Sequence, residues 1–492
     1  MKLVILVPSE EYKRNAGARI RYGRIARRLA KQGVTMALEE ISSFDPRTAQ
    51  CDVMLVSKCY DARALVAAEI LSRRGVPVGV DLFDDYFSQR DDSRLGRFRL
   101  WLRQMLARAD FAICSTDVMR QIIASYAPHC PVHLLADPAP PVDEDHLAGV
   151  LAEKLAHARA SGEIRLAWFG VGDNPNFSVG LSDVAAFAGV LNQLGAGGMA
   201  VDLTILTNAR ALDPPRLAAI AELPVSAVTV DEWSEAAEAE LLASAFACFL
   251  PVNAQGFSTA KSLNRAITAL ASGSQVLAAG YPLYAALQPL LYDRAKDLLN
   301  DLERGRMRLS ASTLDAFGAR IREVASPVAE ADSFQAFLKA LPSRKNAANA
   351  DSPLYLVHGV ATNGPAHKMA QSVGGLSVRT PFCTAQLNFD VSFERRAGAG
   401  LAMLVSDRAL SKMLPDMRSR AVRHGQIGDR NFWEVSGGSI SSSETAPTNA
   451  SVPLEIALYP SMMDSVLAAV EAAFGRGAAI ISETSPLPFA TV

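Results

Sequence analysis

Two hydrophobic patterns alternate along roughly the first 340 residues of this 492-residue chain. Short apolar runs rich in Val, Ile and Leu, such as KLVILV at residues 2–7, are followed by segments with apolar positions at helical spacing. Uninterrupted apolar runs are typical of parallel strands buried on both faces. The strand–helix order therefore predicts a doubly wound α/β sheet. Its expected strands are residues 2–9, 34–41, 51–58, 77–83, 111–116 and 131–137.

The same pattern starts again after a proline-rich segment, ADPAPPVDED at residues 136–145. Prolines grouped in this way are typical of a linker between domains. The second series of expected strands is 164–170, 201–208, 226–230, 246–252 and 274–279. We therefore expect two Rossmann-like parallel-sheet domains, residues 1–140 and 141–342.

The pattern changes beyond a second expected linker, SRKNAANADSP at residues 343–353. Strand-like runs at 354–360, 376–380, 385–394 and 400–407 precede a polar loop, a further run at 453–460, a helix at 462–474 and a last strand at 478–484. We expect a small α+β or β-rich accessory domain over residues 353–492.

Composition narrows the class of protein. A chain of this length exceeds one hydrophobic core, and a net charge of −2 argues against a dedicated nucleic-acid binder. The six cysteines form no CxxC pair, which favours reduced thiols. The sequence shows no signal peptide and no apolar stretch long enough to span a bilayer. These features predict a cytoplasmic protein, and the histidine spacings predict no metal site.

The segment GFSTAKSLNRAITALASG, residues 256–273, is the main candidate for chemistry. It follows the expected strand 246–252 and places Lys261, Ser262 and Asn264 at the start of an expected helix. Backbone N–H groups at a helix N-terminus favour phosphate, and Gly256 would let the backbone approach a ligand. The alternative is that a hydroxyl at 258 or 259 caps the helix and that Lys261 is solvated.

This segment resembles the donor-binding segment of GT-B glycosyltransferases, the family-4-like group that uses nucleotide sugars. The resemblance lies in KSLNR at 261–265, ASG at 271–273 and PLY at 282–284. It implies that Lys261 neutralises the leaving diphosphate, and that Gly256, Phe257, Ser262 and Asn264 contact the donor. Thr268 stands where the family has a glutamate for the donor ribose. Either the ribose is held differently, or donor binding has been lost.

Loops after other expected strands supply further candidates. The loop after the first strand resembles the family's glycine loop, which lies beside the diphosphate and acceptor. In the second half a glycine pair follows a strand, and a polar residue ends the next one. The substrate-binding candidates in these loops are Asn15, Gly17, Arg19, Gly170, Gly172 and Asn208. The alternative is that the glycines only form turns.

The run VGVDLFDDYF, residues 78–87, places three carboxylates at the end of an expected strand. The resemblance puts this run on the acceptor side of the cleft. We expect Asp81 to bind substrate, and Asp84 and Asp85 to be catalytic together with Lys261, because clustered carboxylates orient hydroxyls or raise one another's pKa. The alternative is one capping aspartate with solvated neighbours.

Two basic segments suggest a membrane surface. Residues 13–31 carry eight Lys and Arg and no acid, with Arg21, Arg24 and Arg28 on the expected outer face of a helix. The expected helix 94–108 adds Phe98 and Trp101 among arginines. Basic helices with exposed aromatics bind anionic membranes, which favours peripheral contact with the inner face of the membrane. The alternative is a solvated charged face.

The leading hypothesis is a glycosyltransferase that transfers a sugar from a nucleotide-sugar substrate, without a cofactor. Its acceptor would be a cell-envelope or surface glycan, a lipid-linked sugar or a protein. The alternatives are a catalytically inactive GT-B-like binding or scaffold protein, and an epimerase of the same architecture.

Overall fold

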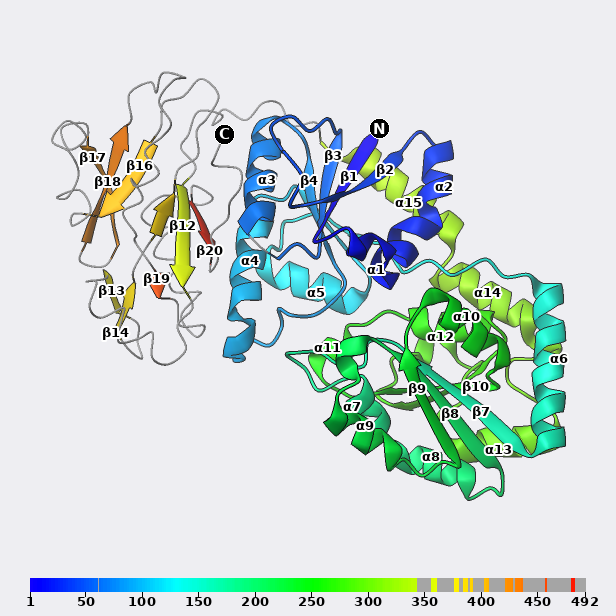
Figure 1. Cartoon of the computed structure of the whole chain (residues 1–492). Coiled ribbons are helices and arrows are strands. Elements are labelled where there is room, and N and C mark those ends of the chain that lie inside the picture. The colour runs from blue at the N-terminus through cyan, green and yellow to red at the C-terminus, as the bar shows by residue number, and fades with distance from the viewer. Residues whose placement is uncertain are drawn as a thin grey trace.

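The computed structural model describes residues 1–60 and 62–342, together with the strands of the third region given below. Figure 1 shows two α/β domains, with the third region beside the first domain. We call them the first domain, the second domain and the third region.

The first domain is built on a six-stranded sheet with the order β2-β1-β3-β4-β5-β6, in which every neighbouring pair is parallel. Its strands are β1 Lys2–Val7, β2 Thr35–Glu40, β3 Val53–Ser57, β4 Val78–Leu82, β5 Phe111–Cys114 and β6 Val132–Leu134. Val4 and Leu6 lie in the core on one face, and Leu3 and Ile5 lie in the core on the other. Both faces are thus covered, as the uninterrupted apolar runs predict.

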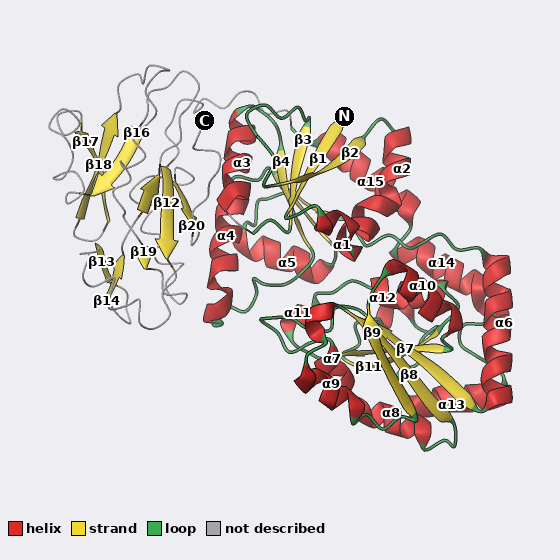
Figure 2. Ribbon diagram, viewed as in Figure 1, coloured by secondary structure: helices red, strands yellow, loops and turns green. Residues whose placement is uncertain are grey.

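Helices flank this sheet on both sides (Figure 2). They are α1 Ala16–Ala18, a π-helical turn Arg19–Gly23, α2 Arg24–Lys31, α3 Ala62–Arg73, α4 Gly96–Leu106 and α5 Asp117–Tyr126. The expected first helix is therefore continuous over residues 16–31, with a π-helical turn in its first half. α5 begins where the Thr116 hydroxyl accepts a hydrogen bond from the backbone N–H of Met119 at 3.2 Å, a side-chain N-cap.

The second domain repeats the plan with a five-stranded parallel sheet in the order β11-β10-β7-β8-β9. Its strands are β7 Glu163–Phe169, β8 Ala200–Thr207, β9 Ala227–Glu232, β10 Ala247–Val252 and β11 Gln275–Gly280. Its helices are α6 Glu144–Ser161, α7 Leu181–Ala186, α8 Ala188–Gly195, α9 Pro214–Ala221, α10 Glu235–Ser244, α11 Gly256–Thr259, α12 Asn264–Ala271, α13 Ala295–Arg304 and α14 Leu314–Val324. The predicted fold class, two doubly wound parallel-sheet domains, is confirmed.

One further helix, α15 Pro327–Ala340, follows the second domain in sequence but packs on the first. Phe334 and Leu338 lie in the same core cluster as Leu3, and Arg28 of α2 forms an ion pair with Asp332 at 2.6 Å. A boundary at residue 140/141 assigns α15 to the second domain, whereas its apolar side chains belong to the core of the first.

The third region contains short strands that pair mainly in antiparallel fashion. They are β12 Tyr355–Val360, β13 Leu376–Arg379, β14 Thr384–Leu387, β15 Asp390–Ser392, β16 Ala402–Ser406, β17 Ala421–Ile427, β18 Arg430–Ser436, β19 Ile456–Ala457 and β20 Ala479–Ser482. β16, β18 and β17 form one antiparallel sheet, and β12 pairs with β15, β19 and β20 in another. The linker expected at 343–353 and the helix expected at 462–474 lie outside the described residues.

The arginines expected on a free outer face of the first helix are not free. Arg21 is 1% exposed and lies in an ion pair described below. Arg24 donates to the carbonyl oxygen of Pro138 at 2.6 Å. Arg28 is bound to Asp332 of α15. On the opposite face of this helix, Ile25 and Leu29 are fully buried.

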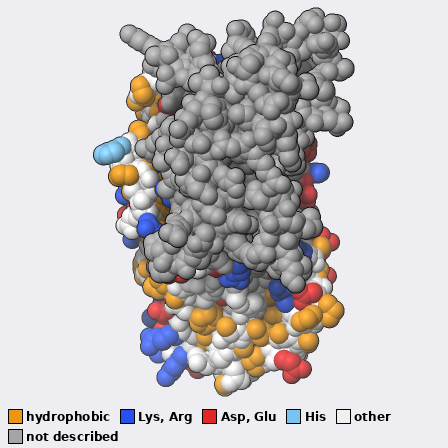
Figure 3. All heavy atoms as spheres, turned by 90° about the vertical axis from the view of Figure 1, so that its left-hand side faces the viewer, with side chains coloured by type: hydrophobic (Ala, Val, Ile, Leu, Met, Phe, Trp, Pro, Cys, Tyr) orange, Lys and Arg blue, Asp and Glu red, His pale blue; other side chains and the backbone are white. Residues whose placement is uncertain are grey.

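The aromatics expected to be exposed on α4 are also buried. Phe98 and Trp101 belong to the core cluster of the first domain, so their predicted exposure is wrong. On the face shown in Figure 3, basic, acidic and hydrophobic side chains are interspersed where the surface is coloured. Among the helices described, none is long and apolar enough to cross a bilayer.

Candidate functional site

The two strand orders define where a ligand would bind in each domain. In the first sheet the chain reverses its direction of growth between β1 and β3, and in the second between β7 and β10. Ligands of open α/β sheets bind outside the carboxyl ends of the strands at such switch points. The segments that follow these four strands begin at residues 8, 58, 170 and 253, and the last of them contains α11.

Arg265 is the most informative side chain at the second switch point. It lies near the start of α12, with its guanidinium carbon 4.9 Å from the ring centre of Trp168 and 5.7 Å from that of Phe169. Its Nε and Nη2 are buried and find no hydrogen-bond partner among the described residues. Buried donors are nearly always satisfied, so this guanidinium has capacity for an anion.

The loop after β7 brings backbone next to Arg265. Gly170 has a φ of +148°, which side-chain-bearing residues rarely adopt, and a Cβ there would lie 3.4 Å from the guanidinium carbon of Arg265. The neighbouring Val171 side chain is 66% exposed. The predicted candidate Gly170 therefore lies at the edge of the site.

Gly172 and Asn208 hold this loop in place through close packing and hydrogen bonds. A Cβ on Gly172 would lie 2.3 Å from Thr207 Oγ1, so the close packing requires glycine. Its N–H donates to Asn208 Oδ1 at 2.9 Å, and Asn208 Nδ2 donates to Asp173 Oδ1 at 2.8 Å. The polar atoms of Asn208 are thus used in holding the loop, and these contacts give it a framework role.

Lys261 lies between two helices and not at the front of one. α11 ends at Thr259 and α12 begins at Asn264, so the expected helix start is a break that contains Lys261 and Ser262. The Lys261 ammonium contacts Asp84 of the first domain and lies 4.1 Å from the ring centre of Phe257. Desolvation lowers the pKa of Lys261 to about 8, with Asp137 opposing the shift and Arg265 adding to it.

The other polar candidates of this segment bond within the protein. Ser262 Oγ donates to Asp137 Oδ2 in the linker at 2.6 Å. Asn264 Oδ1 accepts from Arg24 and from the hydroxyl of Thr268, both at 3.4 Å. The break between α11 and α12 is therefore held to the first domain and to the linker.

The three aspartates of the VGVDLFDDYF run have different surroundings. Asp81 is fully buried and accepts two hydrogen bonds of 2.7 Å from Arg21 and one of 2.5 Å from Tyr22. Burial raises the pKa of Asp81, and Arg21 opposes that shift. With its oxygens occupied in the core, Asp81 belongs to the framework and not to a substrate surface.

Asp85 holds its own loop. Its Oδ1 accepts from the backbone N–H of Phe87 at 3.0 Å and of Ser88 at 2.8 Å, and its Oδ2 bonds the Ser88 hydroxyl. A Cβ on Gly256 would lie 3.3 Å from Asp85 Oδ2, so α11 packs directly against this loop. Asp85 thus holds a turn of its own loop, and no helix begins there, so the helix-capping alternative does not describe it.

Among the described contacts, Asp84 is the one of the three aspartates that pairs with a cation of the second domain. It lies between the ammonium groups of Lys261 and Lys58, which contact one carboxylate oxygen each. Lys58, directly after β3, was missed in the sequence, because a single lysine after a strand carries no signal. Its backbone is left-handed, with φ +59°.

The loop after β1 meets the second domain through Arg19. Its guanidinium pairs with Glu235 at 2.5 Å and lies 5.6 Å from the ring centre of Trp233. Gly17 is required by packing, since a Cβ there would lie 2.8 Å from the Tyr12 hydroxyl. Asn15 is exposed at the start of α1.

Aromatic side chains join the domains beside these charges. Phe257 stacks on Phe177 with ring centres 4.4 Å apart, and both pack against Tyr86 of the first domain at 5.3 and 5.8 Å. The predicted candidate Phe257 is thus a buried interdomain contact that also supports Lys261.

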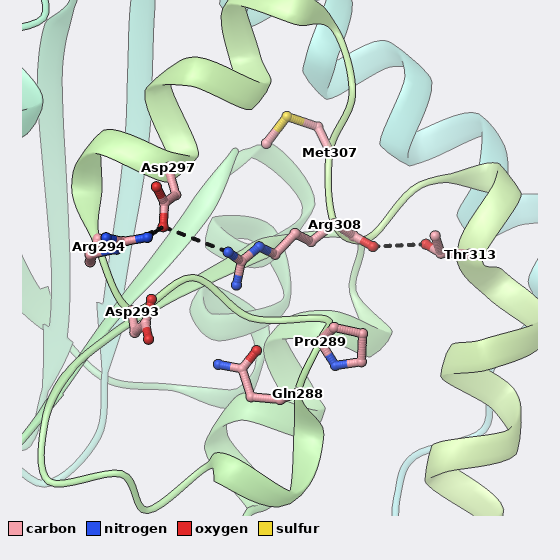
Figure 4. A pocket seen from close by; sticks show the side chains of 8 residues that line it. All are labelled: Gln288, Pro289, Asp293, Arg294, Asp297, Met307, Arg308 and Thr313. Carbon is pink, nitrogen blue, oxygen red and sulfur yellow. Dashed lines mark hydrogen bonds and ion pairs between the residues drawn. The ribbon is translucent and has the colours of Figure 1, made fainter.

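A separate hollow of about 700 Å³ lies in the second domain, away from both switch points (Figure 4). Arg294 and Arg308 line it, and both pair with Asp297, at 2.7 and 3.8 Å. Because these cations already share a carboxylate, the hollow offers less to an anion than the edge at Arg265.

Two doubly wound domains thus meet with the carboxyl ends of their strands facing a common interface. The two domains together have the GT-B fold. No family model matches the chain, and no curated protein matches it in sequence.

Solved structures similar to this chain include glycosyltransferases with the same plan. Alr3699/HepE of Anabaena, solved with UDP and glucose, is 12% identical with a TM-score of 0.48, over 69% of this chain and all of its own. An E. coli structure titled trehalose-6-phosphate, bound with UDP-2-fluoro glucose, is 10% identical with a TM-score of 0.46, over 70% and 100%. A UDP-forming trehalose-phosphate synthase of Burkholderia xenovorans is 15% identical with a TM-score of 0.41, over 66% and 80%. At these values the fold assignment rests on the two strand orders of this chain.

Proposed function

We infer that this protein is a nucleotide-sugar-dependent glycosyltransferase whose donor diphosphate binds at the switch point of the second domain. The observation that carries the proposal is Arg265, a guanidinium with unused donors beside the glycine loop after β7. Guanidinium groups bind phosphate through paired, charge-assisted hydrogen bonds. A nucleotide diphosphate supplies the anion that this edge of the sheet lacks.

Lys261 and Arg265 would act together on the leaving group. Each places a positive charge at the carboxyl edge, and Arg265 is close enough to lower the pKa of Lys261. When the bond from the sugar to the diphosphate breaks, negative charge grows on the phosphate oxygens. Fixed cations at that position stabilise the transition state, an electrostatic effect worth about 3 kcal/mol for a single well-placed donor in other enzymes.

The acceptor would enter from the first domain, beside Asp84 and the loop after β1. A glycan, a lipid-linked sugar or a protein of the cell envelope fits this proposal, which would place the enzyme in polysaccharide biosynthesis. Residues 353–492 would serve as an accessory domain.

A catalytically inactive donor-binding scaffold is the second candidate, and Thr268 favours it. Its hydroxyl reaches Asn264 within the same helix, where the resemblance implies a carboxylate for the donor ribose. Losing such a carboxylate removes charge-assisted hydrogen bonds to two hydroxyls.

Calorimetric titration of the full chain tests the proposal. Uridine, guanosine and adenosine diphosphates and UDP-glucose would be titrated, with Lys261→Ala as the matched variant. Saturable binding that Lys261→Ala weakens, with sugar release or transfer detected by mass spectrometry, supports the enzyme. Saturable binding without turnover supports the scaffold, and absence of binding by every nucleotide contradicts both.

A further inference from the structure

Lys58 lies at the switch point of the first sheet. It directly follows β3, and its φ of +59° is a conformation that residues with a side chain adopt at a cost. Such backbone strain persists where surrounding contacts fix it, and it is frequent in ligand sites. The strained turn aims the lysine side chain across the carboxyl edge toward the second domain.

The side chain of Lys58 is held by groups of its own domain. Its ammonium contacts one oxygen of Asp84 and lies 4.6 Å from the ring centre of Phe83 and 5.9 Å from that of Tyr86. Lys261 reaches the other oxygen of the same carboxylate from the second domain. One carboxylate therefore bridges two ammonium groups that come from different domains.

In direct contact, this bridge holds more positive than negative charge. The ammonium groups of Lys58 and Lys261 share the single carboxylate of Asp84, and Asp81 and Asp137 act on them only at longer range. Desolvation lowers the pKa of Lys58 well below its usual value, and the charge of Lys261 adds to that shift. Without an anion between them the two lysines would repel one another, so the bridge requires one.

A phosphate group is the anion that matches this arrangement. It offers several oxygens that contact two ammonium groups at once, and in a nucleotide diphosphate it carries more charge than one carboxylate. The position lies at the facing carboxyl edges of both sheets, next to Arg265.

We propose that the Asp84 carboxylate occupies the place of a phosphate group of the donor diphosphate, and that a bound diphosphate displaces it and recruits Lys58 as a cation of the donor site. The proposal rests on the proposed function. Asp84 thus competes with the donor in the free protein. When the diphosphate displaces it, the Asp84 carboxylate, which follows β4, becomes free. It is therefore free only after the donor has bound.

Titration of uridine diphosphate into full-length variants tests this competition. Removing the competing charge with Asp84→Asn should raise the affinity by about tenfold, although it deletes a residue of the cleft. Removing the recruited cation with Lys58→Met should lower the affinity by about tenfold.

Two control variants match these charge changes. Glu323→Gln removes a carboxylate from an exposed ion pair, that with Arg320, and Lys31→Met removes an exposed lysine of α2. Both should bind uridine diphosphate as the wild type does, and thermal unfolding checks that every variant is folded.

Four results decide the matter. Equal or weaker binding by Asp84→Asn overturns the proposal, and so does Lys58→Met binding that matches Lys31→Met. If neither the wild type nor Asp84→Asn binds any nucleoside diphosphate, the proposed function fails first and this inference falls with it. Binding that is detectable only in Asp84→Asn supports the displacement.

Discussion

The two domains share a plan and differ in how they use charge at equivalent places. Behind the first sheet's switch point, Arg21 is buried and fully engaged, bonding Asp81 twice at 2.7 Å and the carbonyl of Leu135 at 2.9 Å. At the second sheet's switch point, Arg265 keeps two buried donors without partners among the described residues. The first arginine fixes the fold, and the second is left for a ligand.

This comparison separates framework from function where topology does not. Both sheets are parallel, and each has one switch point. The polar atoms of Asp81, Asp85 and Asn208 are occupied by hydrogen bonds within the protein, so these residues belong to the framework. The charged residues that can change partners when a ligand binds are Arg265, Lys261, Lys58 and Asp84.

Removing Arg21 should give the largest effect on stability. Arg21→Met leaves Asp81 buried and without its cation, which costs about 3–5 kcal/mol of unfolding free energy. Urea unfolding followed by circular dichroism measures the loss. Arg28→Met, which breaks an exposed pair with Asp332, should have a much smaller effect. Equal effects of the two variants would contradict the framework role of Arg21.

Removing Arg265 should affect binding and spare stability. Arg265→Met deletes a guanidinium with unused donors, so unfolding should change little. A loss of about 2–3 kcal/mol of phosphate binding corresponds to roughly thirty- to 150-fold weaker binding of uridine diphosphate by calorimetry. Arg216→Met is the control, because Arg216 pairs locally with Asp213. If Arg265→Met unfolds at a lower urea concentration than the wild type but binds uridine diphosphate normally, Arg265 has the framework role assigned to Arg21, which would contradict this prediction.

The pH dependence of binding should be intermediate in size. Because the pKa of Lys261 is lowered to about 8, its ammonium is present below that pH and is lost above it. Between pH 7.5 and 9 the affinity for uridine diphosphate should therefore fall, by about five- to tenfold. In Lys261→Met this dependence should be absent, and a dependence that survives in the variant belongs to another group.

The smallest effect is expected at Thr268. Its hydroxyl makes a 3.4 Å hydrogen bond to Asn264 within one helix. Thr268→Val keeps the shape of the side chain, so uridine diphosphate affinity should change by less than about twofold. A large loss in calorimetry would show that the donor ribose is held by this hydroxyl.

The strands of both parallel sheets could be predicted because their cause is local. Continuous apolar runs such as KLVILV and FACFLPV identify doubly covered strands wherever they occur. The π-helical turn of the first helix at residues 19–23 could not be predicted. It accompanies the pairing of Arg21 with Asp81, 60 residues away, which no local pattern encodes. β17 was missed because AVRHGQI shows no clean alternation.

The candidate site could be predicted only in part, because tertiary contacts also decide the role of each polar side chain. Residue types and spacing singled out Lys261 and its segment, but they could not tell which polar atoms would be used within the protein. Lys58 depends on a backbone angle and on a carboxylate 26 positions later, Asp84, and both are set by tertiary structure. The predicted exposure of Arg21 and Trp101 was wrong for the same reason, because contacts distant in sequence bury both side chains.

A structure of this protein with uridine diphosphate bound tests the central claim most directly. The account predicts diphosphate oxygens within hydrogen-bond distance of Arg265 and Lys261, at the carboxyl edge of the second sheet. A diphosphate bound in the hollow between Arg294 and Arg308, or one that leaves Arg265 without a partner, would contradict it.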